Sequence, residues 1–200
     1  MRNIFSWIWI LLGAMSANAS VLISIEDRAI PVGATTAALP VRAAGGDKIS
    51  ALALTLQIGD GGEILGGTEP FSISGFDSSS GIFNPAFFDF QFAPPGAGFG
   101  TVRLNITPKT SNVNAIAEGL IGYILINTTP SDEQRTVDIH PTIADSINIP
   151  FLITKAQDSA LNTIPLTFSD GRLSVILPEP GAFSLVAAGG LLFLRRRLPK

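Results

Sequence analysis

The chain has 200 residues, of which 46% are hydrophobic and 14% charged, and its formal net charge is −3. It has no cysteine and one histidine, which excludes disulfides, thiol catalysis, Cys-ligated zinc and a multi-histidine metal site within one chain. The sequence has no basic excess that would attract a phosphate backbone, so nucleic acid is not an expected partner.

Residues 1–19 have the three parts of a secretory signal peptide. Arg2 supplies the positive start, and residues 4–13 form a mostly apolar run, too short for the roughly 20 residues that span a bilayer. Ala17 and Ala19 place small residues at the two positions that a signal peptidase reads, so we expect cleavage after Ala19. The alternative is an uncleaved N-terminal anchor.

Residues 20–176 read as one all-β domain, a two-layer antiparallel β-sandwich. Short β-rich runs recur between Gly, Pro, Asn and Asp clusters, and no stretch has a convincing helical period. In residues 101–107, for example, Val102, Leu104 and Ile106 fall on one side, with Arg103 and Asn105 on the other. The predicted strands are 21–25, 38–42, 49–58, 87–92, 101–107, 120–127, 136–140, 147–154, 164–168 and 172–177.

Local signals add three details to this prediction. Asp170-Gly171 is a strong hairpin-turn dipeptide and predicts that the last two strands pair with each other. Residues 114–119 are the one place where a helical turn is expected. The Gly- and Ser-rich stretches 59–67 and 72–81 are expected to be long loops within the sandwich.

Catalysis is not expected. A Ser-His-Asp site would need His140 as its base, oriented by Asp138 or Asp145, and no G-x-S-x-G motif presents a serine. The adjacent carboxylates Glu26-Asp27 and Asp132-Glu133 point apart on a strand end or turn, which does not suit glycoside hydrolysis. Gly96, Gly98 and Gly100 precede a predicted strand, whereas a dinucleotide fingerprint needs a helix there.

Calcium is the one inorganic partner that we retain as a candidate; no other cofactor is expected. Asp60, Glu63 and Asp77 lie in the Gly- and Ser-rich stretches, where hard oxygen ligands can tie loops together. No run matches an EF-hand, so unbound acidic loops are the alternative.

The C-terminal residues 177–200 have the pattern of a sorting segment. Pro178, Glu179 and Pro180 are followed by fourteen residues without charge, 181–194, and then by three arginines, Arg195, Arg196 and Arg197. A helix over 181–194 would extend roughly 21 Å, short of the ~30 Å hydrocarbon core. The arginines would hold its end on the cytoplasmic side. An ordinary C-terminal tail anchor is the alternative.

This order of Pro-Glu-Pro, apolar segment and arginine cluster resembles the PEP-CTERM sorting signal of bacterial exported proteins. The resemblance implies processing near Pro178-Glu179-Pro180 by an exosortase, after a transient stay in the inner membrane. In that family the signal often accompanies export of extracellular polysaccharide and matrix proteins. Between the two removed ends, eight basic and fifteen acidic residues leave the domain with a formal charge of −7.

The layout of the middle also resembles the cohesin-like, carbohydrate-module-type jelly-roll sandwich. The matching places are a first strand VLISIEDRAIPVG, a Pro-containing strand ALPVRA, a long strand ending at Gly59-Asp60, and a closing strand after Asp170-Gly171. Cohesins bind dockerin modules through one sheet face, but no residue match carries a binding surface across.

Together these patterns predict an exported, non-enzymatic structural or adhesive protein of the cell surface or extracellular matrix. Its expected processing partners are signal peptidase and exosortase, and its ligand would be a surface protein or an extracellular polysaccharide. A secreted carbohydrate-binding module is the first alternative. The scarcity of large aromatic residues counts against it, because the mature chain has no Trp and only one Tyr, Tyr123. A secreted hydrolase is the second.

Overall fold

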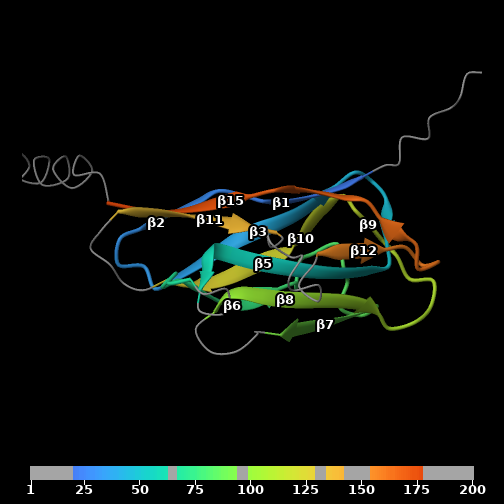
Figure 1. Cartoon of the computed structure of the whole chain (residues 1–200). Helices are drawn as coiled ribbons and strands as arrows, with labels where there is room; N and C mark the ends of the chain where they lie inside the picture. The colour runs from blue at the N-terminus through green and yellow to red at the C-terminus, as the bar shows by residue number, and fades with distance from the viewer. Residues whose placement is uncertain (1–19, 63–66, 94–98, 129–133, 142–153, 178–200) are drawn as a thin grey trace, which may run out of the picture.

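The computed structural model describes residues 20–62, 67–93, 99–128, 134–141 and 154–177. These residues form an all-β, two-layer sandwich with no helix among them, which confirms the predicted fold class (Figure 1). The expected signal helix and the C-terminal segment lie outside the described residues. Within the described ranges, no helix is both long enough and apolar enough to cross a bilayer.

The first layer is a five-stranded sheet. Its strands, in spatial order, are β14 (Leu166–Ser169), β1 (Val21–Ile25), β3 (Thr36–Ala44), β10 (Gly119–Asn127) and β6 (Ser72–Asp77). The pairs are antiparallel except β1 with β14, which is parallel.

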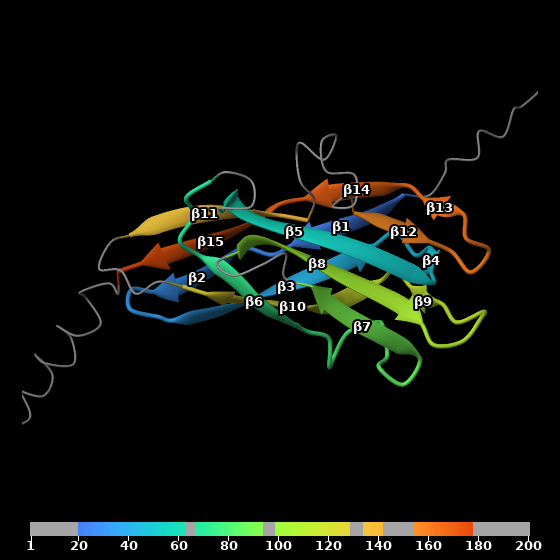
Figure 2. The same ribbon diagram turned by 60° about the horizontal axis from the view of Figure 1, so that its bottom comes forward.

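The second layer is built around the long strand β5 (Ala51–Gly62) (Figure 2). One edge of β5 pairs with β8 (Phe99–Pro108), which pairs in turn with β7 (Phe88–Ala93). The other edge is shared by two strands. The beginning of β5 pairs with β12 (Lys155–Gln157) and its later part with β11 (Arg135–His140). Outside them lie β13 (Thr163–Ile164), next to β12, and β15 (Gly171–Ile176) with β2 (Arg28–Pro31), next to β11. The short strands β4 (Lys48–Ile49) and β9 (Ala115–Ile116) pair only with each other and belong to neither sheet.

A threonine bridges the gap that β11 and β12 leave along β5. The Thr154 hydroxyl accepts a hydrogen bond from the backbone N–H of Thr55 at 2.8 Å and donates to the Pro141 carbonyl at 2.7 Å. Thr55 and Thr154 are both buried, so this hydroxyl satisfies a backbone donor that would otherwise lack a ladder partner.

The core lies between the two sheets and follows the period-2 alternation of the strands. Alternate side chains point inward and are almost inaccessible to solvent, as the alternation in the predicted strands 49–58 and 101–107 implied. The inward residues of β5 and β8 are Leu52, Leu54, Leu56, Ile58, Val102, Leu104 and Ile106, each no more than 1% exposed.

The predicted hairpin at Asp170-Gly171 is wrong. β14 pairs with β1 in the first sheet, whereas β15 pairs with β11 and β2 in the second, so Asp170 carries the chain between the layers. A Cβ on Gly171 would lie 2.5 Å from Cγ2 of Ile25. The glycine is therefore required by a close interlayer approach and not by a two-residue turn.

Three further differences concern elements of low β-propensity. Residues 114–119 contain β9 and not a helical turn, because the Ala117 N–H donates to the Asp47 carbonyl at 2.8 Å, a non-local partner. Residues 72–77, expected to be loop, form the edge strand β6 along β10. Strand β5 continues to Gly62, into the expected loop 59–67. The predicted strand 147–154 lies outside the described residues except for Thr154, and a strand begins at Lys155.

The two ends of the described chain lie at opposite ends of the sandwich (Figure 1). At one end the Val21 N–H donates to the Pro165 carbonyl, beside β13, at 3.0 Å. At the other the Ile176 carbonyl accepts from the Val32 N–H, beside β2, at 2.9 Å. Any segment that follows Leu177 therefore leaves from the end far from Ser20.

Candidate functional site

The outer face of the second sheet carries an open groove across β12, β5, β8 and β7, with a volume of about 240 Å³ and a lining of polar and aliphatic residues. The outward residues of these strands line it, together with parts of Leu52 and Ile106. They are Ala51, Ala53, Gln91, Arg103, Asn105, Thr107, Lys155 and Gln157.

The strand register places the groove residues in rows. Lys155 is opposite Ala53, Ala53 opposite Asn105, and Asn105 opposite Gln91, so one row crosses four strands. Arg103 belongs to the next row, opposite Thr55. Because β5 carries only methyl groups at Ala51 and Ala53, the longer side chains of β8 and β12 stand above it as walls.

The two cations of the groove lack anionic partners. Arg103 Nε donates to Asn105 Oδ1 at 2.9 Å, and no described carboxylate lies within ion-pair distance of Arg103 or Lys155. Four other bases of the described chain are ion-paired: Arg42 with Glu26, Lys109 with Asp89, Arg135 with Glu69 and Arg172 with Asp138. Arg28 and Lys48, elsewhere in the described chain, have no ion pair either, so the groove is distinguished by a lining that holds two cations and no carboxylate.

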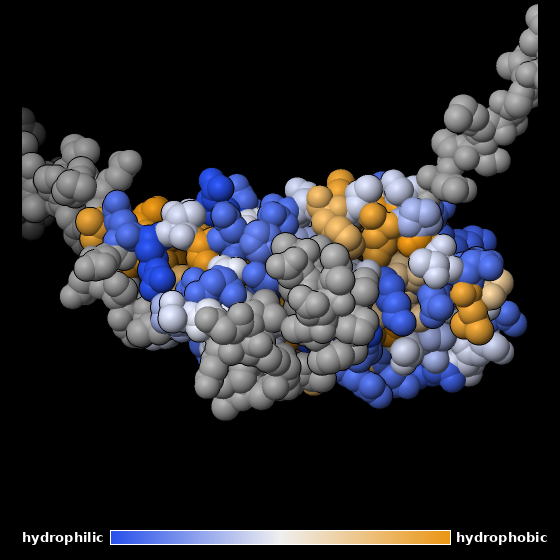
Figure 3. Space-filling model, in the orientation of Figure 1, coloured by the Kyte–Doolittle hydropathy of each residue, from blue (hydrophilic) through white to orange (hydrophobic). Residues whose placement is uncertain are grey.

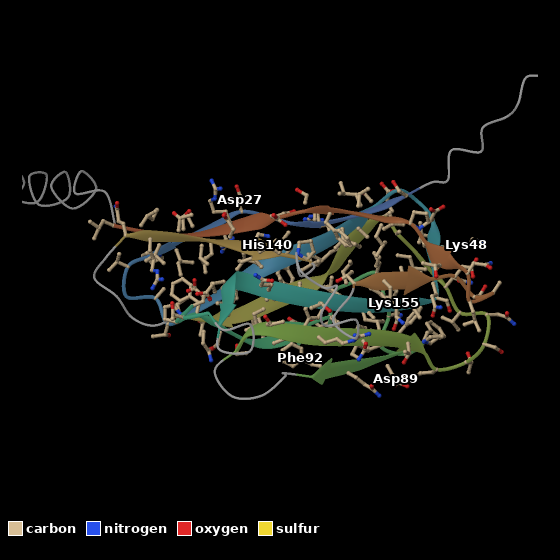
Figure 4. The ribbon with its side chains drawn as sticks, in the orientation of Figure 1. Asp27, Lys48, Asp89, Phe92, His140 and Lys155 are labelled. Atoms are coloured by element: carbon tan, nitrogen blue, oxygen red, sulfur yellow. The ribbon has the colours of Figure 1, made fainter. Side chains whose placement is uncertain are left out.

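The surrounding surface is hydrophilic. In Figure 3 the lower edge of the molecule, over β7 and β8, is mostly blue. Figure 4 places Lys155 over the half of the sheet that carries β12, and Asp89 at the β7 edge. The exposed large apolar side chains of the described residues all lie outside the groove lining: Leu22, Phe87, Ile116, Leu125, Leu161, Phe168, Ile176 and Leu177.

His140 lies in the other half of the sheet, at the end of β11, and does not reach the groove (Figure 4). Its Nδ1 is 2.8 Å from Oδ2 of Asp170, in the connection between β14 and β15. The expected partner Asp138 instead pairs with Arg172 Nε at 3.0 Å, which raises the pKa of Arg172. Asp145 lies outside the described residues. Within the described chain no serine or threonine hydroxyl is hydrogen-bonded to His140, so His140 and Asp170 form a close pair without the hydroxyl that a nucleophilic triad needs.

The expected carboxylate pairs are not brought together for chemistry in the described residues. Glu26 is ion-paired with Arg42. Asp132 and Glu133 lie outside the described residues, as do Gly96 and Gly98. Gly100 lies in β8, between Phe99, which pairs with Gly62, and Thr101, which pairs with Gln57.

Of the three calcium candidates, Asp60 and Asp77 accept hydrogen bonds from backbone N–H groups of residues that follow them in the chain. Asp60 Oδ1 accepts from the N–H groups of Gly62 and Glu69, both at 2.9 Å, and Oδ2 accepts from the Thr68 N–H at 2.6 Å. Asp77 accepts from the Ser79 N–H at 2.9 Å. Glu63 lies outside the described residues, and among those described no three acidic or histidine side chains form a metal-sized cluster. Calcium binding therefore remains a prediction from the sequence.

The Asp60 bonds have a consequence for stability. The Thr68 N–H, followed by that of Gly62, holds the pKa of Asp60 below its usual 3.8, because each bond favours the charged form. We expect Asp60→Asn to lower the free energy of unfolding at pH 7 by about 1–2 kcal/mol.

The pH dependence gives this prediction its check. A lowered carboxyl pKa stabilises the fold above the unfolded value of about 3.9, and the benefit is lost as pH falls through the folded value. Urea unfolding between pH 3 and 7 should therefore show a larger difference between wild type and Asp60→Asn at the upper end. Asp77→Asn, which loses the charge from a site with one backbone bond, serves as the control with a smaller effect. Equal stability of wild type and Asp60→Asn at pH 7 would contradict the prediction.

The groove was only partly predictable. Alternation in 101–107 already placed Arg103 and Asn105 on the outer side of their strand, whereas nothing in the sequence placed Lys155 beside them. The predicted processing residues, Ala17 and Ala19 at one end and those from Pro178 to Arg197 at the other, lie outside the described residues.

Comparisons with known proteins identify the fold. No protein-family model and no curated protein matches the chain. Among solved structures, the sixth cohesin of scaffoldin B from Acetivibrio cellulolyticus, solved with a dockerin, is 15% identical with a TM-score of 0.58 over 78% of this chain and 99% of its own. A cohesin of Clostridium thermocellum, solved with a dockerin, is 14% identical with a TM-score of 0.59 over 82% and 99%. A non-cellulosomal cohesin from Archaeoglobus fulgidus is 14% identical with a TM-score of 0.55 over 83% and 98%. The chain therefore has a cohesin-like β-sandwich fold.

Proposed function

We propose that this chain is a non-enzymatic adhesion module of the cell surface or extracellular matrix, which binds an extracellular partner through the groove on β12, β5, β8 and β7. The observation that carries the proposal is a sheet face with a hollow over Ala51 and Ala53, lined by three amides and by two cations without an ion-pair partner among the described residues. A site on strands holds its side chains more precisely than a site on loops.

The fold supports a binding role. Cohesin-like structural neighbours were solved with dockerins, so the same sandwich serves protein–protein interaction in those proteins. The close pair of His140 and Asp170 has no described hydroxyl nucleophile beside it, which favours binding over hydrolysis. A carbohydrate-binding module is the second candidate, favoured by the amides of Gln91, Asn105 and Gln157 in the groove.

The ends of the chain support an exported location. The signal peptide would be cut after Ala19, and an exosortase would process the chain near Pro178-Glu179-Pro180. In the described domain, β12 and Ser20 lie at one end and Leu177 at the other (Figure 1). A precursor held to the inner membrane by the segment after Leu177 would therefore present the groove away from the bilayer.

The test is adhesion in the native host. A strain whose chain carries Arg103→Gln and Lys155→Gln should lose cell–matrix attachment to the same extent as a deletion strain. The matched control carries Lys109→Gln and Arg172→Gln, which removes the same charge from ion-paired positions outside the groove. Surface levels of each variant are measured by immunoblot of the surface fraction. Normal attachment by the groove variant at normal surface level would overturn the proposal.

A further inference from the structure

We infer that the groove binds an acidic polysaccharide, with Arg103 and Lys155 holding carboxylates along the glycan and the neighbouring amides binding its hydroxyls. The inference rests on the proposed function of the groove as a binding site and names the ligand class. It follows from charge, spacing and hydrogen-bonding chemistry, taken in turn.

The charge of the groove lining favours an anionic ligand. The lining holds Arg103 and Lys155 and no carboxylate, although the domain between Ser20 and Pro178 has a formal charge of −7, which opposes a polyanion at long range and is screened by salt. No described carboxylate lies within ion-pair distance of either cation. A carboxylate entering the groove would meet two unneutralised cations, and the guanidinium of Arg103 keeps the donors that are not bonded to Asn105.

The spacing of the two cations allows a polymer to engage both. Lys155 and Arg103 belong to adjacent rows and are separated by the strand β5, so their Cα atoms are roughly 12 Å apart, given strands ~4.8 Å and rows ~6.7 Å apart. Over that distance the two long side chains can converge on one carboxylate or hold two separate ones. A polymer with successive carboxylates can engage both at once and gains from the second contact without a new loss of translational freedom.

Hydrogen-bonding chemistry favours a glycan over an acidic protein segment. Gln91, Asn105 and Gln157 carry amide groups, which suit hydroxyl groups that both donate and accept. Asn105 Oδ1 already accepts from Arg103 Nε at 2.9 Å and Gln157 Nε2 donates to the Leu161 carbonyl at 3.4 Å, so these two amides keep part of their hydrogen-bonding capacity. Protein interfaces depend on buried aromatic or large aliphatic anchors. The exposed large apolar side chains of the described residues lie outside the groove lining, so such an anchor is not present there.

The first experiment compares polymers of different chemistry on the full-length chain in detergent micelles. Isothermal titration is run with polygalacturonate, with neutral dextran, and with poly-L-glutamate, at low and at physiological salt. We expect binding to polygalacturonate that weakens as salt rises, because exposed charges are screened. Dextran should not bind, and poly-L-glutamate should bind at least about tenfold more weakly, since it lacks the hydroxyls that the amides bind.

The second experiment maps the site. Arg103→Gln and Lys155→Gln should each weaken polygalacturonate binding about fivefold to tenfold, and the double variant should abolish it. The matched control Lys109→Gln, whose lysine is held by Asp89 and by the Pro85 carbonyl outside the groove, should change it by less than about twofold. Thermal melting of each variant confirms that it is folded before titration.

Each other outcome overturns the inference. Equal binding of poly-L-glutamate and polygalacturonate would identify an acidic protein as the ligand class, and absence of binding to both would exclude an anionic ligand. Binding that persists in the folded double variant would place the glycan elsewhere. If these titrations fail while attachment of cells still depends on Arg103 and Lys155, the adhesion proposal stands and the polysaccharide inference does not.

Discussion

Replacing Gly171 by alanine is expected to lower the free energy of unfolding by about 2–3 kcal/mol, a large part of the stability of a domain of this size. The new Cβ would lie 2.5 Å from Cγ2, 2.8 Å from Cβ and 2.8 Å from the carbonyl oxygen of Ile25. Ile25 is only 3% exposed, and its backbone is held in β1 by pairing with Val41. Neither the side chain nor the backbone of Ile25 can move away from the new Cβ without disturbing the packing of β1 against β15.

Gly75 provides the matched control, because a Cβ there would meet Leu125 Cδ1 at 3.4 Å, an ordinary contact. Gly75→Ala should therefore change stability by less than about 0.5 kcal/mol. Shortening the neighbour in the double variant Gly171→Ala with Ile25→Ala should cost less than the sum of the two single changes, since the clashing Cγ2 is removed. Urea unfolding measures all four variants. Wild-type stability in Gly171→Ala would show that the two sheets are not so close at this point.

The same glycine shows where sequence reasoning about the fold succeeds and where it fails. Alternation in residues 49–58 and 101–107 predicted both strands and their buried faces, because burial of one face imposes a period of two. Asp170-Gly171 has the local chemistry of a hairpin, but its real partner is Ile25, about 150 residues earlier in the chain. No local pattern records such a contact.

Short or glycine-rich strands were missed for a related reason. Strand β6 contains Ser72, Ser74 and Gly75, which are poor strand formers in isolation, and it is held in extended form by pairing with β10. Strand β9 has two residues, and its neighbour Ala117 bonds to Asp47. In both places tertiary hydrogen bonds override the propensity of the local sequence.

The groove was predictable in its chemistry along one strand and not in its assembly. The alternation of Val102, Arg103, Leu104 and Asn105 already implied an outer face with one cation and one amide. The partner cation Lys155 is brought to it by the pairing of three-residue β12 with the start of β5, a contact between segments about 100 residues apart. The rows across β12, β5, β8 and β7 can be derived only from the register of the strands, which the sequence does not give.

The C-terminal segment, which the sequence predicts to be a processing signal, yields the other large expected effect. Replacing Pro178, Glu179 and Pro180 together by alanine should abolish removal of the segment that follows, while cleavage after Ala19 continues. The physical reason is the backbone before the apolar segment. A residue that precedes proline disfavours the α region, so we expect the natural motif to keep the bonds around Glu179 extended and open to a protease at the membrane surface. Alanines would let the helix extend back through these positions.

The length of the uncharged segment 181–194 is the reason to expect that it holds the precursor in the membrane only for a time. As a helix it would extend roughly 21 Å against a hydrocarbon core of ~30 Å, so it would form a marginal span that depends on snorkelling of Arg195, Arg196 and Arg197. Intact-mass spectrometry of surface protein from the native host checks the prediction. The wild type should begin at Ser20 and lack the apolar segment, whereas the alanine variant should begin at Ser20 and retain it. Removal of the N-terminal peptide in both proteins is the internal control for export. A wild-type surface protein that still ends at Lys200 would contradict exosortase processing and make residues 181–194 an ordinary anchor.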